Sequence, residues 1–257
     1  MTVVVAPPHL TEQARRDWDL LQSPTRRAPA FDPEQAGLLP EPARRWLLHA
    51  IAPGTPLRRA VVLSMRGMMR IGEWRRFHAN QALLPLEGYV WAAGTRLGPA
   101  PVHGFDRYRA GAGEMRWRLL DAVPVMSGSG PDLTRSAAGR LACEFVLAPA
   151  AALDPRVRWK ALDDRQAVAT LPIGGEDHEV TLDIAPDGRL ERVSMDRWGN
   201  PDGQAFREHR FGVECVEEGM FDGFTIPVRV VGGWWPGTDQ RVEGEFIRYA
   251  LDDALFR

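Results

Sequence analysis

Residues 59–71, RAVVLSMRGMMRI, decide the fold class of this chain. Apolar and polar side chains alternate along this stretch, and this period of two is typical of a strand with one buried face. The apolar members are Val61, Leu63, Met65, Met69 and Ile71, and the polar members are Ser64, Arg66 and Arg70. The stretch therefore predicts that a β-sheet begins near Arg59.

Similar segments, separated by Gly or Pro, fill most of the remaining chain. Adjacent short strands with turn signals between them favour antiparallel meanders. A single sheet of about a dozen strands must curl or close to protect its edges, so we expect a curved half-barrel or open barrel. The further predicted strands are 75–83, 87–97, 101–109, 113–120, 156–162, 165–172, 177–184, 189–198, 206–216, 224–231 and 241–249.

Three helices are predicted, two before the sheet and one inside it. The first two cover residues 10–22 and about 42–52, and the third covers about 132–147 with Asp132 as a good N-cap. We expect the third helix to lie against the concave face of the sheet. The fold class is therefore β-rich α+β, with an N-terminal helical extension over residues 1–30 and a single β-rich domain over residues 31–257.

Composition and charge narrow the function classes. The formal net charge is −2, which gives no reason to expect nucleic acid or an anionic membrane as a partner. The N-terminal MTVVVAPPHL predicts neither a signal peptide nor a membrane span, so we expect a cytoplasmic location. The two cysteines, Cys143 and Cys215, are expected to be small buried side chains. The six histidines show no metal-ligand spacing, and we expect no metal and no cofactor.

The inserted helix carries an acidic residue where an apolar one is expected. At 100° per residue, Glu144 falls inside the apolar face that should meet the core. Arg140 stands one turn earlier, so the two side chains can form an i,i+4 ion pair. Two interpretations remain open: a weak structural pair at the helix surface, or a pair that points into the hollow of the sheet. The apolar face consists of Leu133, Ala137, Leu141, Phe145 and Ala148.

Other polar and aromatic candidates lie on the strands. In the predicted strand 101–109, Asp106 and Tyr108 share one face, and His103 and Phe105 share the opposite one with Arg107. The nine tryptophans can fill the core of a wide sheet or line an apolar pocket. Arg197 on its strand is either an outward charge or a cation in the cavity.

Several stretches in a fixed order resemble a bacterial family known as a conserved domain of unknown function. They run from LPEPARRWLLHAIAPG through FDRYRAGAGEMRWRLL and SAAGRLACEFVLAPAAL to VRWKALDD. The resemblance covers residue 30 onward. More loosely, the strand–helix–strand plan is similar to the half-barrel of periplasmic lipoprotein carriers, from which this chain is expected to differ in lacking an export signal. The positions that match the family motif are Trp91, Asp106, Gly111, Gly113, Arg140, Glu144, Trp159 and Arg197.

Three hypotheses of function follow. In the first, the protein binds an apolar or amphipathic small molecule between sheet and helix. In the second, it is an enzyme with Glu144 as general acid or base and Asp106 as a further catalytic candidate. In the third, it is a protein–protein interaction module without a small ligand, whose partner the sequence does not identify. The candidate ligand-binding residues are Trp91, Asp106, Arg140, Glu144, Trp159 and Arg197.

Overall fold

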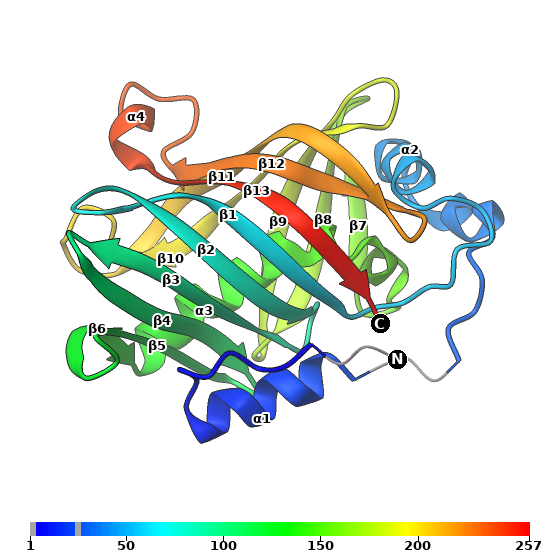
Figure 1. The fold of residues 1–257 in the computed structure, drawn as a ribbon. Coiled ribbons are helices and arrows are strands. Elements are labelled where there is room, and N and C mark those ends of the chain that lie inside the picture. The colour runs from blue at the N-terminus through cyan, green and yellow to red at the C-terminus, as the bar shows by residue number, and fades with distance from the viewer. Residues whose placement is uncertain (1–3, 24–26) are drawn as a thin grey trace.

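The computed structural model describes residues 4–23 and 27–257, so residues 1–3 and 24–26 of the predicted extension lie outside the described residues. The described chain forms one curved antiparallel sheet of 13 strands with few helices (Figure 1), which confirms the β-rich α+β prediction. The strands are β1 (Val61–Ile71), β2 (Glu73–Leu84), β3 (Gly88–Leu97), β4 (Ala100–Arg109), β5 (Ala112–Leu119), β6 (Val123–Ser129), β7 (Arg158–Ala161), β8 (Gln166–Ile173), β9 (Glu176–Ile184), β10 (Leu190–Gly199), β11 (Arg207–Phe221), β12 (Phe224–Trp234) and β13 (Glu245–Phe256).

Two meanders make the sheet. The strand order is β6-β5-β4-β3-β2-β1-β13-β12-β11-β10-β9-β8-β7, so each half pairs neighbours along the chain. The halves join where β1 pairs with β13 in antiparallel register, Val61 opposite Phe256. This seam brings residues that are distant in the sequence to the middle of one wall.

The helical elements connect and cover the sheet. The connection from β6 to β7 leads from one edge of the sheet to the other, and α3 on this path contacts β3–β6 of the first meander and β8–β10 of the second. Figure 1 shows α3 running behind β1 and β2, on the concave side. The helices are α1 (Glu12–Leu21), η1 (Pro33–Leu38), α2 (Glu41–Ala50), α3 (Pro131–Cys143), η2 (Glu144–Leu147), η3 (Pro149–Leu153) and α4 (Arg241–Gly244).

The ends of α3 differ from the prediction in two details. Gly130, not Asp132, is the N-cap residue, and Pro131 occupies the first helical turn, where its missing N–H leaves no intrahelical bond unmade. The Asp132 carboxylate instead accepts a hydrogen bond of 2.9 Å from Trp198 Nε1. At the other end the α-helix stops at Cys143, and residues 144–147 continue as the tighter 3₁₀ turn η2.

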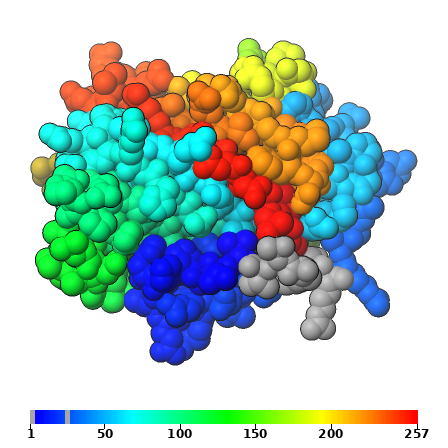
Figure 2. All heavy atoms as spheres, viewed as in Figure 1, coloured from blue at the N-terminus to red at the C-terminus, as the bar shows by residue number. Residues whose placement is uncertain are grey.

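The convex face of the sheet is covered in part by α1. Trp18 and Leu21 pack against Val62, Val90 and Phe105 in a small core of their own. Figure 2, seen from the same side as Figure 1, shows α1 lying over the lower part of this face, while β1, β2, β12 and β13 reach the surface above it. The two faces of the sheet therefore have separate cores.

At the β7–β9 end of the sheet, α2 packs over the strands and seals the core. Trp46 of α2 meets Phe145 of η2 edge-on, with ring centroids 5.8 Å apart, and Trp159 of β7 lies 6.0 Å from both rings. This three-ring cluster anchors η2, on the connection from β6 to β7, to α2 and to the edge strand β7.

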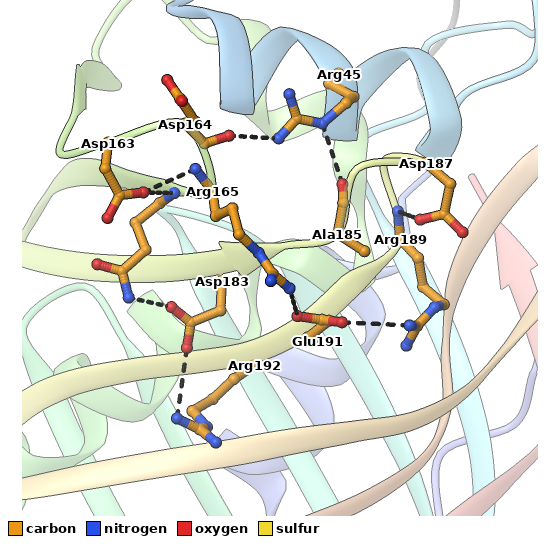
Figure 3. A network of polar contacts seen from close by, with 11 residues as sticks. Arg45, Asp163, Asp164, Arg165, Asp183, Ala185, Asp187, Arg189, Glu191 and Arg192 are labelled. Carbon is orange, nitrogen blue, oxygen red and sulfur yellow. Dashed lines mark hydrogen bonds and ion pairs between the residues drawn. The ribbon is translucent and has the colours of Figure 1, made fainter.

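A network of arginines and carboxylates binds α2 to the neighbouring hairpins (Figure 3). Arg45 donates to the backbone carbonyls of Ala185 at 3.1 Å and Asp164 at 2.7 Å. Glu191 accepts from Arg165 at 2.7 Å and from Arg189 at 3.3 Å. Because these charges satisfy one another at the protein surface, we assign the network a structural role of modest strength.

One strand was missed by the sequence analysis. Residues 123–129, which none of the predicted strands covers, form the edge strand β6, paired with β5. Most of its side chains are exposed, Val123 and Val125 among them, so no buried face gives the alternation that marks a strand. None of the described helices is both long and apolar enough to cross a bilayer.

Candidate functional site

A cavity of about 300 Å³ lies between α3 and the concave face of the sheet. Its lining comes from α3 and η2, from β1–β5 of the first meander and from β10–β13 of the second. The lining is predominantly apolar, and its charged groups come from both halves of the chain. Apolar members include Met65, Leu133, Val213, Val230, Phe246 and Ile247.

Strand alternation explains how the charged and aromatic lining residues reach this cavity. On β4, Asp106 points to the concave side, whereas Phe105 packs under α1 and Arg107 pairs with Asp17 of α1 at 2.8 Å. On β3, Tyr89 and Trp91 are two residues apart and both line the cavity. The division of faces predicted for residues 101–109 is therefore confirmed.

Arg140 is the centre of the polar cluster in the cavity wall. Its Nε donates to Glu144 Oε1 at 2.7 Å and its Nη1 to Asp106 Oδ2 at 3.2 Å. The guanidinium also lies over the Tyr89 ring, 4.6 Å from the centroid, and over the Trp91 ring, 5.1 Å from the centroid. One cation thus pairs with two carboxylates and lies over two aromatic faces.

Glu144 faces the cavity because it caps the end of α3, and its side chain is 18% exposed. One carboxylate oxygen accepts from Arg140, and the other accepts from Gln81 Nε2 of β2 at 2.5 Å. The i,i+4 pair predicted from the sequence is present, and it points into the hollow rather than to the outer surface. Gln81 was not predicted as a site residue. It lies on β2 opposite Trp91 of β3, so the register between these two strands is the signal that could have identified it.

Asp106 is the carboxylate most affected by burial. Desolvation raises the pKa of Asp106 above its ordinary value, while the Arg140 charge and a hydrogen bond from Trp117 Nε1 at 3.2 Å act in the opposite direction. Its side chain is 24% exposed, into the cavity. Burial and the Arg140 cation therefore act in opposite directions on this carboxyl group.

Arg197 reaches the same cavity from β10 but has a different environment. Its Nε donates to the Ser136 carbonyl at 3.1 Å and its Nη2 to Ser136 Oγ at 3.3 Å. The guanidinium lies over the rings of Phe211 and Trp234, 5.0 and 5.3 Å from the centroids. Within residues 4–23 and 27–257 it forms no ion pair with a carboxylate, and burial lowers its pKa. The cavity cation predicted as one alternative for Arg197 is the one observed.

Two cysteines and two tyrosines complete the lining, and the sequence analysis did not assign them to it. Cys143 and Cys215 are both buried, as expected; burial raises the pKa of Cys143 to about 12 and also raises that of Cys215. Burial likewise raises the pKa of Tyr89 and of Tyr249, which keeps both hydroxyls protonated at neutral pH. The side chains therefore offer neutral, weakly polar groups.

Of the other predicted site residues, Trp91 lines the cavity and Trp159 does not. Trp91 is 4% exposed and donates its Nε1–H to Met65 Sδ at 3.4 Å. Trp159 packs in the cluster with Trp46 and Phe145, and its Nε1 donates to the Ala152 carbonyl at 3.1 Å. The structure thus brings five of the six candidate ligand-binding residues together and leaves Trp159 in the core beside α2.

The motif glycines have structural explanations. Gly111 turns the chain between β4 and β5 with φ +73°, a conformation that favours glycine. At Gly113, an added Cβ would lie 2.7 Å from Thr134 Cα, and the Gly113 amide donates to Thr134 Oγ1 at 3.0 Å. A side chain here would push α3 away from β5, so this glycine sets the position of the helix that carries Arg140 and Glu144.

A second hollow of about 820 Å³ lies on the convex face, between the segment before α1 and β2–β5. It gathers three histidines, two arginines and one aspartate: His9, His78, His103, Arg116, Arg118 and Asp121. His9 and His103 stack with ring centroids 5.3 Å apart, and His103 contacts Asp121 at 2.8 Å. In the described parts of the chain, no group of three or more His, Cys, Asp or Glu side chains is arranged to hold a metal ion.

Acid is expected to weaken the packing of His9 against His103. Burial, and next the His103 charge, lower the pKa of His9 below 6.5, while a contact of its ring with the Gly104 carbonyl raises it. Between the lowered pKa of His9 in the folded protein and 6.5, the unfolded chain binds more protons than the folded one. The stabilisation is therefore fully present above pH 6.5 and is lost as the pH falls through the pKa of His9 in the folded protein. Urea unfolding between pH 7.5 and about pH 5 measures this effect. His9→Gln should lose stability less steeply than the wild type; parallel curves would contradict the expectation.

Comparison with known proteins gives one family and several solved structures. A family model described as "Family of unknown function (DUF6544)" matches residues 29–245. No curated protein matches the chain. The family match confirms the resemblance to a bacterial family of unknown function that the sequence predicts.

The solved structures are similar at low identity. A domain assigned to outer membrane lipoprotein sorting from Vibrio parahaemolyticus has 11% identity and a TM-score of 0.39, over 77% of this chain and 85% of that one. A LolA superfamily protein from Nitrosomonas europaea has 10% identity and a TM-score of 0.41, over 77% and 85%. A DUF1329 family protein from Desulfovibrio piger has 12% identity and a TM-score of 0.35, over 88% and 94%. Likeness at this level says nothing about what the chain binds.

Proposed function

We propose that this chain, which belongs to DUF6544, a family of unknown function, binds an apolar or amphipathic small molecule in the cavity beneath α3. The observation that carries the proposal is the cavity itself, about 300 Å³ of space with mostly apolar walls and a few convergent polar groups. Protein interiors are close-packed, and hollows of this composition are typical of ligand pockets, which start at roughly this volume.

The charged groups of the wall support a ligand with a polar end. Arg140, Glu144 and Asp106 hold one another in fixed positions through hydrogen bonds, so their orientation does not depend on a ligand. Preorganised polar groups in an apolar pocket orient a ligand at low entropic cost. An amphipathic molecule would place its polar end among the charged groups of the wall and its apolar end against the apolar lining.

Filling the cavity should abolish binding. Ala137 is a buried α3 residue that lines the hollow, so Ala137→Phe adds a ring inside it and leaves Arg140, Glu144 and Asp106 themselves unchanged. We expect the affinity for 8-anilinonaphthalene-1-sulfonate to fall at least about tenfold, measured by fluorescence titration. Native mass spectrometry of protein purified without detergent should show a co-purifying molecule in the wild type and none in this variant.

A matched control separates filling from the general effect of an added ring. Ala205 is exposed in the turn between β10 and β11, so Ala205→Phe adds the same ring outside the cavity. This control should bind like the wild type. Wild-type protein that binds neither the dye nor any co-purifying molecule, or an Ala137→Phe variant that binds as well as the control, would refute the proposal.

The catalytic hypothesis for Glu144 and Asp106 stays a prediction, as do the interaction-module hypothesis and the cytoplasmic location. The contacts of Glu144 are those of a held carboxylate: Arg140 binds one oxygen and Gln81 the other. A Glu144 that acts on a ligand would first have to exchange one of these partners. The binding proposal needs no such exchange and is therefore preferred.

A further inference from the structure

The two arginines of the cavity differ in their charge balance. Arg140 is paired with Asp106 and Glu144, so that cluster alone carries more negative than positive charge. Glu114, the remaining acid of the lining, pairs with Arg107 at 2.8 Å and Arg116 at 3.6 Å. Among the described residues, Arg197 is the lining cation without an acidic partner.

The hydrogen bonds of Arg197 are also incomplete. A guanidinium has five N–H donors, and Ser136 accepts from two of them, through its carbonyl and its hydroxyl. The guanidinium lies over the rings of Phe211 and Trp234, 5.0 and 5.3 Å from their centroids, and neither ring provides a hydrogen-bond acceptor. Three N–H groups thus stay available beside an apolar hollow, where an unsatisfied charged donor is costly.

Two hydroxyls add neutral donors to the same hollow. Tyr89 and Tyr249 both line the cavity, and neither hydroxyl has a hydrogen-bond partner within the described part of the chain. By contrast, each carboxylate oxygen of Asp106 and Glu144 already accepts a hydrogen bond, from Arg140, Trp117 or Gln81. The unpartnered donors among the described residues of the cavity therefore include one charged group, the Arg197 guanidinium.

From this arrangement we propose that the ligand is a single-chain amphiphile with an anionic head group, and that the Arg197 guanidinium binds that head. The inference rests on the proposed function and narrows it from any amphipathic molecule to an anionic one. A carboxylate or a phosphate matches the planar fork of arginine with two parallel hydrogen bonds. The tail lies against apolar lining such as Val213, Val230 and Ile247.

Ligands with one tail and different heads test the inference. Isothermal titration of the wild type should rank decanoate or decyl phosphate above decan-1-ol, and decan-1-ol above decyltrimethylammonium. Comparison of decanoate with decyl phosphate identifies which anion the site prefers. Arg197→Gln should weaken binding of the preferred anion by roughly 10- to 100-fold and leave decan-1-ol within about threefold, because only the charged hydrogen bond is lost. Arg197→Lys should keep part of the preference.

A control variant and two contrary results separate failure of this inference from failure of the proposed function. Arg158 is exposed on β7 and pairs with Asp177 outside the cavity, so Arg158→Gln should leave all affinities unchanged. Equal wild-type affinities for the alcohol and the anions, or preference for the cationic head, would overturn the inference while the proposed function stands. Failure of every ligand to bind would instead overturn the proposed function. Circular dichroism of each variant confirms that the fold is intact.

Discussion

Arg140→Met should lower the free energy of unfolding by about 3 to 5 kcal/mol, because it leaves two carboxylates in an apolar wall without their cation. The Arg140 side chain is only 19% exposed, and Asp106 and Glu144 lose the donors that hold them at 3.2 and 2.7 Å. Methionine keeps much of the length and packs on Tyr89 and Trp91, so lost volume contributes little. Urea unfolding at pH 7 measures the effect.

The matched control removes the charges together. In the triple variant Arg140→Met, Asp106→Asn, Glu144→Gln, no uncompensated charge remains, and replacement of a whole buried ionic group by neutral side chains is often close to neutral. Most of the lost stability should therefore return. A single variant as stable as the wild type would mean that water or a ligand in the cavity already screens the cluster.

Phe145→Ala should cost about 3 to 5 kcal/mol through the hole that it leaves. Phe145 is fully buried, and its ring packs against both Trp46 of α2 and Trp159 of β7. Without the ring, η2 loses its contacts with both Trp46 and Trp159. No neighbouring element can easily move in to fill the hole. Thermal and urea unfolding at neutral pH measure it.

Phe246→Ala is the comparison for this substitution. Phe246 is a partly buried ring that already borders the open cavity, so its truncation enlarges an existing hollow instead of creating a new one. We expect a clearly smaller loss of stability. Equal losses at both positions would show that the Trp46–Phe145–Trp159 cluster contributes no more than an ordinary apolar side chain.

Local patterns were sufficient to predict most of the fold. Alternation placed Asp106 and Phe105 on opposite faces of β4, and the helical period placed Glu144 within the apolar face of the inserted helix with Arg140 one turn earlier. Both are short-range rules that depend only on the period of the element. They fail where no buried face exists, which is why no strand is predicted at the exposed edge strand β6.

The residues of the site could not all be predicted, because they depend on the pairing of strands that are distant in the sequence. Tyr249 and Cys215 enter the cavity only because β13 joins β1 and β11 lies two strands farther along. A sequence pattern cannot give that order. For the same reason Trp159 could be assigned to a strand but not to a place within the sheet, and it lies under α2 instead of in the cavity.

The seam between β1 and β13 has a consequence for the chain as the ribosome makes it. β1 stands in the middle of the finished sheet, yet its partner β13 is made after every other described strand. Until residues 245–256 have emerged, β1 is an open edge with unpaired backbone groups, the kind of surface that invites aggregation. The same late residues supply Phe246, Ile247 and Tyr249, so the cavity beneath α3 has no complete wall until β13 has emerged.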